Sequence, residues 1–76
     1  MKRNSQNVQH QLGVTIQKQR KQMGYSQESF ALLCGVHRTY MGGVERGERN
    51  VSLVNILKIS KGLNMTASEL FFWAKL

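Results

Sequence analysis

The chain has 76 residues, which suffices for one small domain whose core leaves a narrow margin of stability. Its 11 Lys and Arg residues against 4 acidic ones give a formal net charge of +7, which favours a polyanionic partner, either nucleic acid or a membrane surface. The single cysteine excludes an internal disulfide, and we find neither a signal peptide nor the ~20 apolar residues of a transmembrane helix, so we expect a cytoplasmic protein.

The chain contains no proline and no Asn-Gly or Asp-Gly hairpin signal, which argues against a β fold. Five helices are predicted along it instead. Residues 1–6 are polar and predict a flexible basic arm, and residues 7–76 predict one domain. Val8, Leu12 and Ile16 recur at helical spacing and predict a first helix that stops at Gly24. Ser26 is the expected cap of a second helix.

The second half of the chain predicts three more helices. The third should span about residues 37–46, and Ser52 should cap the fourth. Apolar residues cover nearly every face of that fourth helix, which predicts a place in the middle of the core; they are Leu53, Val54, Ile56, Leu57, Ile59 and Leu63. Thr66 and Glu69 have the spacing of a capping box and predict the start of a fifth helix.

The second and third helices have the residue spacing of a helix-turn-helix unit. Counted from Gln27 as position one, position five is Ala31 and position nine is Gly35. Two helices that cross steeply leave room for only a small side chain at position five, and glycine at position nine can leave the first helix in a left-handed conformation. The positions that should form the small core between the helices are all apolar: Phe30, Cys34, Val36, Met41 and Val44.

The run "SQESFALLCGVHRTYMGGVERGERNVSL" resembles the Cro/CI-type (Xre) helix-turn-helix family, over about residues 14–70. This resemblance implies an all-α domain of five helices, in which the second and third read DNA. Within it, "RTYMGGVERGERNVSL" is most similar to the controller proteins of restriction–modification systems. Gly42 stands where the family often has serine, and Val51 replaces a frequent proline. The expected function is therefore a transcriptional regulator that binds palindromic operators in double-stranded DNA as a homodimer.

Candidate DNA contacts follow from the way a helix-turn-helix unit docks on DNA, with its second helix in the major groove. Arg38 and Thr39 lie in the first turn of the third helix, which points into the major groove, where arginine reads guanine through two acceptors. Gly42 is a third candidate base contact, because adjacent glycines on this helix let another backbone come close, of DNA or of a neighbouring helix. His37 should cap the helix or meet a phosphate. The full set of candidate phosphate contacts is Gln27, His37, Tyr40, Arg46, Arg49 and Asn50.

Two further sets of residues have structural roles in this prediction. The resemblance implies that Arg20 pairs with Glu45 and ties the first helix to the third. The C-terminal "ELFFWAKL" carries more aromatic surface than so short a segment can bury, so we expect Phe72, Trp73 and Asn55 to meet their symmetry mates in a dimer. In the alternative, Leu70, Phe71 and Trp73 turn inward and leave a monomer.

Catalysis and metal binding are not expected. The chain has no Asp, its four Glu residues lack a nearby His or Ser partner, and Cys34 occupies a core position. Cys34 and His37 have the spacing of half a zinc site, but no second pair exists. We therefore expect no cofactor, no small-molecule ligand and no membrane partner. The competing functions are a phage-type repressor, an antitoxin that binds its own operator, and a nonspecific basic RNA- or membrane-binding protein.

Overall fold

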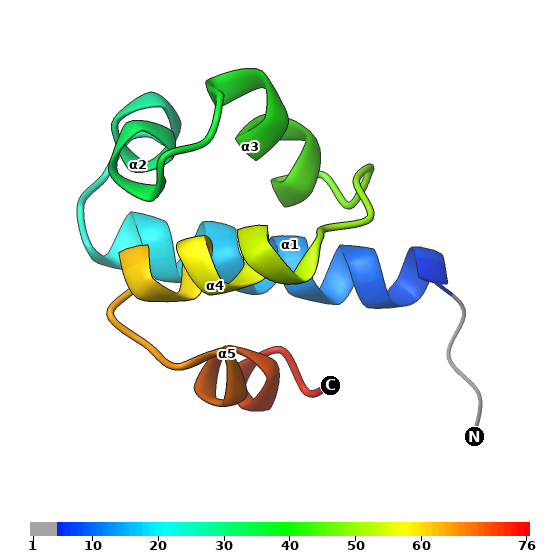
Figure 1. Cartoon of the computed structure of the whole chain (residues 1–76). Helices are drawn as coiled ribbons and strands as arrows, with labels where there is room; N and C mark the ends of the chain where they lie inside the picture. Colours follow the sequence, from blue (N-terminus) through cyan, green and yellow to red (C-terminus); the bar gives the residue numbers. More distant parts are fainter. Residues whose placement is uncertain (1–4) are drawn as a thin grey trace.

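The computed structural model describes residues 5–76, and side chains from residue 7 onward. Within that range the chain is all-α, as predicted, and forms five helices (Figure 1). They are α1 (Ser5–Gln22), α2 (Gln27–Cys34), α3 (Arg38–Glu45), α4 (Leu53–Gly62) and α5 (Ala67–Trp73). α1 begins at Ser5, within the arm expected over residues 1–6, and the rest of that arm lies outside the described residues.

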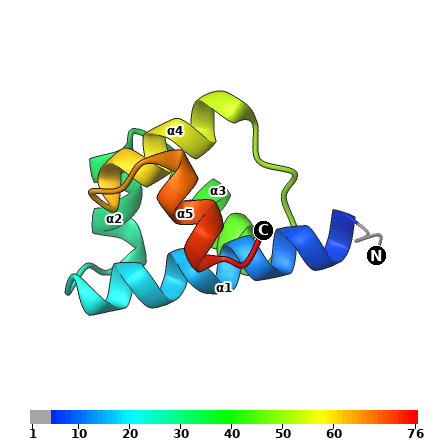
Figure 2. The same cartoon turned by 90° about the horizontal axis from the view of Figure 1, so that it is seen from below.

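The long helix α1 is the element around which the others assemble. It packs against α3 on one side and α5 on another, while α2 contacts both α3 and α4. In Figure 1, α2 and α3 lie above α1 and α5 lies below it; Figure 2 shows α5 between α1 and α4. The α2–α3 pair therefore forms one end of the molecule, supported from beneath by α1.

Local signals in the sequence account for the helix boundaries. The Ser26 and Ser52 side chains each accept a hydrogen bond from the backbone N–H three residues on, as N-caps do. The capping box at Thr66 and Glu69 is present in both directions, with hydrogen bonds of 2.9 and 3.0 Å.

The core receives large apolar side chains from all five helices. Phe30 and Ile16 are fully buried together with side chains of α3, α4 and α5. Each such side chain contributes about 1.5–3 kcal/mol to the free energy of folding by leaving water. The largest fully buried side chains are Phe30, Ile16, Met41, Ile59, Leu70 and Val44.

The prediction that α4 lies in the middle of the core is wrong. Leu53 is 69% exposed, and Val54 and Leu57 are also mainly exposed, while Ile59 is buried. The reason is that α4 packs mainly against α2 and α5, so one of its faces is left uncovered. Its remaining apolar residues form an outer surface.

No helix in the described part of the chain is both long and apolar enough to cross a membrane.

The close approach of α1 to α3 depends on Gly13, a residue that the sequence analysis did not single out. A Cβ at this position would lie 2.7 Å from the carbonyl oxygen of Glu45 and would also meet the carbonyl oxygen of Val44. Both obstacles are backbone atoms near the end of α3. The absence of a side chain at Gly13 therefore determines how closely α3 sits on α1.

Candidate nucleic-acid interface

The turn between α2 and α3 has the geometry that its spacing predicted. Ala31 and Phe30 are buried, and Val36 packs against the same core. Gly35 adopts the left-handed conformation, with φ of 76°, and the Val36 N–H donates to the Ala31 carbonyl at 3.0 Å. This turn fixes the angle at which α3 leaves α2.

A buried ion pair holds α3 against α1. The Arg20 Nε and Nη2 atoms donate to the two carboxylate oxygens of Glu45 at 2.8 and 3.0 Å, and Nη1 donates to the Tyr25 carbonyl at 2.8 Å. The two side chains are only 7% and 1% exposed. The pair that the resemblance implied is therefore present, and its two-pronged geometry fixes both orientation and distance.

Gln27 joins this network instead of standing free at the surface. Its Nε2 atom donates to Glu45 Oε1 at 3.0 Å, so one carboxylate anchors side chains from α1 and α2. The side-chain amide expected to contact phosphate is committed to Glu45 in the unbound protein.

The first turn of α3 is capped internally and displays two side chains. His37 is the N-cap, and its Nδ1 atom accepts a hydrogen bond from the Thr39 N–H at 3.1 Å. Arg38 and Thr39 are exposed. The Arg38 side chain is 68% exposed, and its Nη1 atom donates to Glu28 Oε2 at 2.9 Å. The two expected base contacts thus protrude from a rigid, capped helix end.

A hollow of about 450 Å³ lies beside these side chains, in the surface that α2 and α3 share. Its lining residues are Gln27, Glu28, Arg38, Thr39, Gly42 and Arg46. A Cβ at Gly42 would lie 3.1 Å from Arg46 Nη1 and 3.2 Å from Gln27 Oε1, the ends of two flexible side chains. Gly42 is therefore covered by movable groups and not by another helix.

The cationic residues after α3 are also engaged within the protein. Arg46 Nε and Nη2 donate to the Glu48 carboxylate at 3.0 and 3.2 Å, and these hydrogen bonds lower the pKa of Glu48. The Arg49 guanidinium carbon lies 5.6 Å from the centroid of the Tyr40 ring, within cation–π distance. Arg49 also covers Gly43, while Asn50 is exposed. Of these residues, Arg46 lines the same hollow as Arg38.

Two exposed arginines pair with carboxylates that no pattern in the sequence indicates. Glu28, in the first turn of α2, pairs with Arg38 ten residues later. Glu48 pairs with Arg46. Neither pair follows the spacing of a helix or a strand, because Arg46 and Glu48 lie two residues apart at a loop and Glu28 and Arg38 lie on either side of a turn. Only the folded backbone brings these groups together.

Comparison with known proteins places this geometry in a family. A family model described as "Helix-turn-helix" matches residues 16–70. The chain belongs to the helix-turn-helix family. It is 53% identical over 60 residues to control protein C.MunI from a Mycoplasma species, covering 78% of this chain and 81% of that protein. It is 56% identical over 45 residues to control protein C.BamHI from Bacillus amyloliquefaciens, covering 59% of this chain and 56% of the relative.

A solved structure extends the similarity to three dimensions. The crystal structure of the restriction–modification controller protein C.AhdI from Aeromonas hydrophila superposes with a TM-score of 0.80. It is 49% identical in sequence, and the match covers 83% of this chain and 96% of that chain.

The C-terminal helix of this helix-turn-helix domain displays the aromatic residues proposed for dimerisation. Phe72 is 76% and Trp73 57% exposed, and their rings meet edge-on with centroids 6.0 Å apart. Leu70 is buried and Phe71 is partly buried. The alternative in which Trp73 also turns inward therefore does not describe this chain. Asn55 on α4 is partly exposed.

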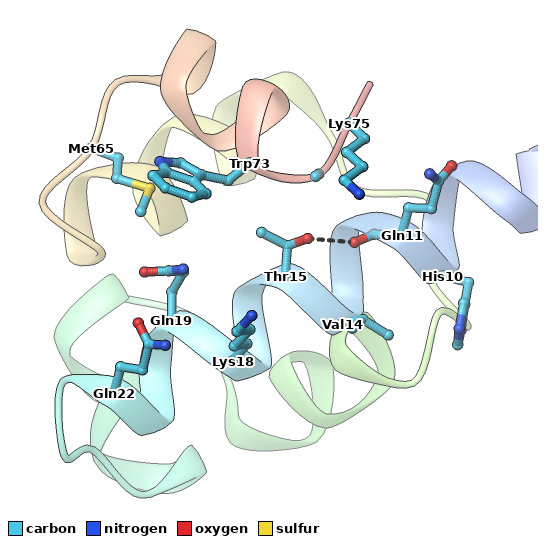
Figure 3. Close-up of a pocket in the computed structure, with 11 residues that line it drawn as sticks. His10, Gln11, Val14, Thr15, Lys18, Gln19, Gln22, Met65, Trp73 and Lys75 are labelled. Carbon is cyan, nitrogen blue, oxygen red and sulfur yellow. Dashed lines mark hydrogen bonds between the residues drawn. The ribbon is translucent and has the colours of Figure 1, made fainter.

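A second concavity, a groove of about 550 Å³, lies between α1 and the C-terminal segment (Figure 3). Thr15 and Lys18 project into it from α1, and Trp73 and Met65 line the opposite wall. The Thr15 hydroxyl donates to the Gln11 carbonyl at 2.8 Å within α1. The lining contains no carboxylate side chain. This groove involves α5, whereas the hollow beside Arg38 involves α2 and α3.

Cys34 is a free cysteine buried in the core. Burial raises the pKa of the Cys34 thiol to about 11, so this cysteine stays neutral and is a poor nucleophile at neutral pH. Among the described residues, no group of three or more His, Cys, Asp or Glu side chains could hold a metal ion.

Proposed function

We propose that this chain is a sequence-specific DNA-binding regulator of transcription, of the controller type found in restriction–modification systems, and that it acts in the cytoplasm. The observation that carries the proposal is the exposed Arg38–Thr39 turn at the capped end of α3, beside a hollow that Gly42 also lines. The names of the similar proteins, control protein and restriction–modification controller protein, support the choice of regulator class.

In the proposed complex, the N-terminal end of α3 enters the major groove. Arg38 would contact guanine, Thr39 would contact a neighbouring base edge or a thymine methyl, and Gly42 would let the base pair approach the helix. The residues around this end would meet the sugar–phosphate backbone and set the register without reading sequence; they are Gln27, His37, Tyr40, Arg46, Arg49 and Asn50.

We propose further that the protein binds as a two-fold dimer joined through its last two helices. One recognition helix reads only a few base pairs, whereas two of them about 34 Å apart would match half-sites of a palindrome on one face of the duplex. Phe72, Trp73 and Asn55 are the proposed contacts with the symmetry mate. The exposed apolar residues of α4 support this arrangement, because an apolar outer surface usually marks an interface.

The Arg38→Ala variant tests the proposed base contact. A preferred duplex is first selected with the parent protein from a randomised pool, and binding is then compared with a scrambled duplex at one salt concentration. Loss of a two-pronged guanine contact should cost about 1–3 kcal/mol on the selected duplex and much less on the scrambled one. An equal loss on both duplexes would show that Arg38 contacts only phosphate.

Arg49→Ala is the matched control, since it removes the same charge from the proposed backbone contact. It should weaken binding to both duplexes alike and reduce the slope of log K against log salt by about one.

The dimer is tested by sedimentation at micromolar concentration. Trp73→Glu places a charge on the proposed interface at an exposed position, so it should dissociate the dimer without unfolding the domain. Leu32→Glu is the control, because Leu32 is exposed on α2, which is not one of the two helices of the proposed interface. A parent protein that sediments as a monomer and binds the palindrome without cooperativity would refute the dimer.

A further inference from the structure

Glu28 is a carboxylate on a surface that the proposed function brings against a polyanion. It lines the hollow together with Arg38 and is itself 71% exposed as a side chain. A negative charge here repels phosphates and lowers the affinity for any duplex. An exposed ion pair contributes little to folding stability, so stability alone does not explain it.

The other three glutamates of the chain each have a partner elsewhere. Glu45 is buried against Arg20, Glu48 pairs with Arg46 in the loop after α3, and Glu69 completes the capping box of α5. Glu28 is therefore the carboxylate that contacts the expected base-reading side chain.

We propose that Glu28 is a positioning residue for base recognition, which holds the Arg38 guanidinium in the orientation that reads guanine. This inference rests on the proposed function and deepens it, because it assigns part of the sequence specificity to α2. Glu28 would not touch the base that Arg38 reads; it acts through Arg38.

The geometry leaves the guanidinium able to bind DNA while it is held. The hydrogen bond to Glu28 uses Nη1, at 2.9 Å. The part of the chain that the structure describes provides no other partner for this side chain, so the N–H groups on Nε and Nη2 are available for the O6 and N7 acceptors of guanine. A long arginine that is already oriented loses less rotational freedom when it binds.

The same pair penalises incorrect sequences. Where no guanine faces Arg38, its remaining N–H groups find at most a single acceptor on one base, such as adenine N7 or thymine O4, in place of two. Discrimination then comes from holding the guanidinium in the orientation that suits two acceptors, because a base that offers one acceptor loses part of this contact. The attraction between Glu28 and Arg38 strengthens as the duplex displaces water from the hollow, because the local dielectric constant falls.

The test compares Glu28→Gln with Glu48→Gln. Both variants remove one charge from an exposed carboxylate that pairs with an arginine on the proposed DNA face, so they match in charge and in surroundings. The parent, the two variants and Arg38→Ala are each used to select duplexes from one randomised pool, and the bound duplexes are sequenced. Arg38→Ala identifies the position at which guanine preference depends on Arg38.

At that position, Glu28→Gln should lower the preference for guanine about fivefold, the effect expected for loss of one exposed ion pair. Preferences at the other positions should stay unchanged. Glu48→Gln should leave every preference as in the parent, while both variants should bind random duplexes more tightly. An unchanged guanine preference in Glu28→Gln, or the same change in Glu48→Gln, would overturn the inference. If the parent itself enriches no sequence, the proposed function fails instead.

Discussion

Replacing Glu45 by alanine should cost about 3–5 kcal/mol in the free energy of unfolding, because it leaves the Arg20 guanidinium buried without its counterion. The Gln27 amide loses its acceptor in the same step. Since a domain of this size has a total stability of about 4–11 kcal/mol, a large part of its folding free energy would disappear. Urea denaturation followed by circular dichroism measures the effect.

Two comparisons make this test specific to the buried pair. Glu48→Ala breaks an exposed pair and should leave the urea midpoint nearly unchanged. In a double-mutant cycle, Arg20→Met combined with Glu45→Leu should recover part of the loss, since neither charge is then buried alone. Losses that simply add would show that the two residues are not coupled.

Gly13→Ala should destabilise the protein by about 3 kcal/mol, at the upper end of the range for overpacking. The new Cβ would lie 2.7 Å from the Glu45 carbonyl oxygen, and a backbone atom cannot move aside without shifting α3. Alanine gains about 0.5–1 kcal/mol in helix propensity over glycine, which offsets only part of this cost. Thermal unfolding measures the balance.

Gly42→Ala is the control for this prediction, because it makes the same substitution in a helix where only flexible side-chain ends lie nearby. Those ends can move, so the propensity term should dominate and Gly42→Ala should be neutral or slightly stabilising. A Gly13→Ala variant as stable as the parent would contradict the close packing of α1 on α3.

Short-range features could be predicted from the sequence because their causes are local. A serine N-cap, the Thr66–Glu69 capping box and the left-handed Gly35 each depend on a few consecutive residues, and all are present. The small residue at Ala31 and the apolar positions around it follow from the steep crossing of two short helices. These features suffice to specify the α2–α3 unit and to place Arg38 and Thr39 on an exposed first turn.

Long-range features were not accessible in the same way. The composition of α4 predicted burial on every face, but burial depends on how many neighbours a helix has, and α4 has them on one side only. The role of Gly13 likewise depends on where the carbonyl groups at the end of α3 come to lie.

The sequence by itself determined the five helices, their caps and the residue types presented by the reading unit, because each follows from hydrogen bonding and steric limits within about one helical turn. Only the tertiary structure decided how the exposed charges pair and what joins the buried pair. Arg38 meets Glu28 across a turn, and Gln27 donates to the Glu45 carboxylate that the resemblance had paired with Arg20. An ion pair depends on the distance between atoms in space, and that distance is fixed only when the core brings separate helices together.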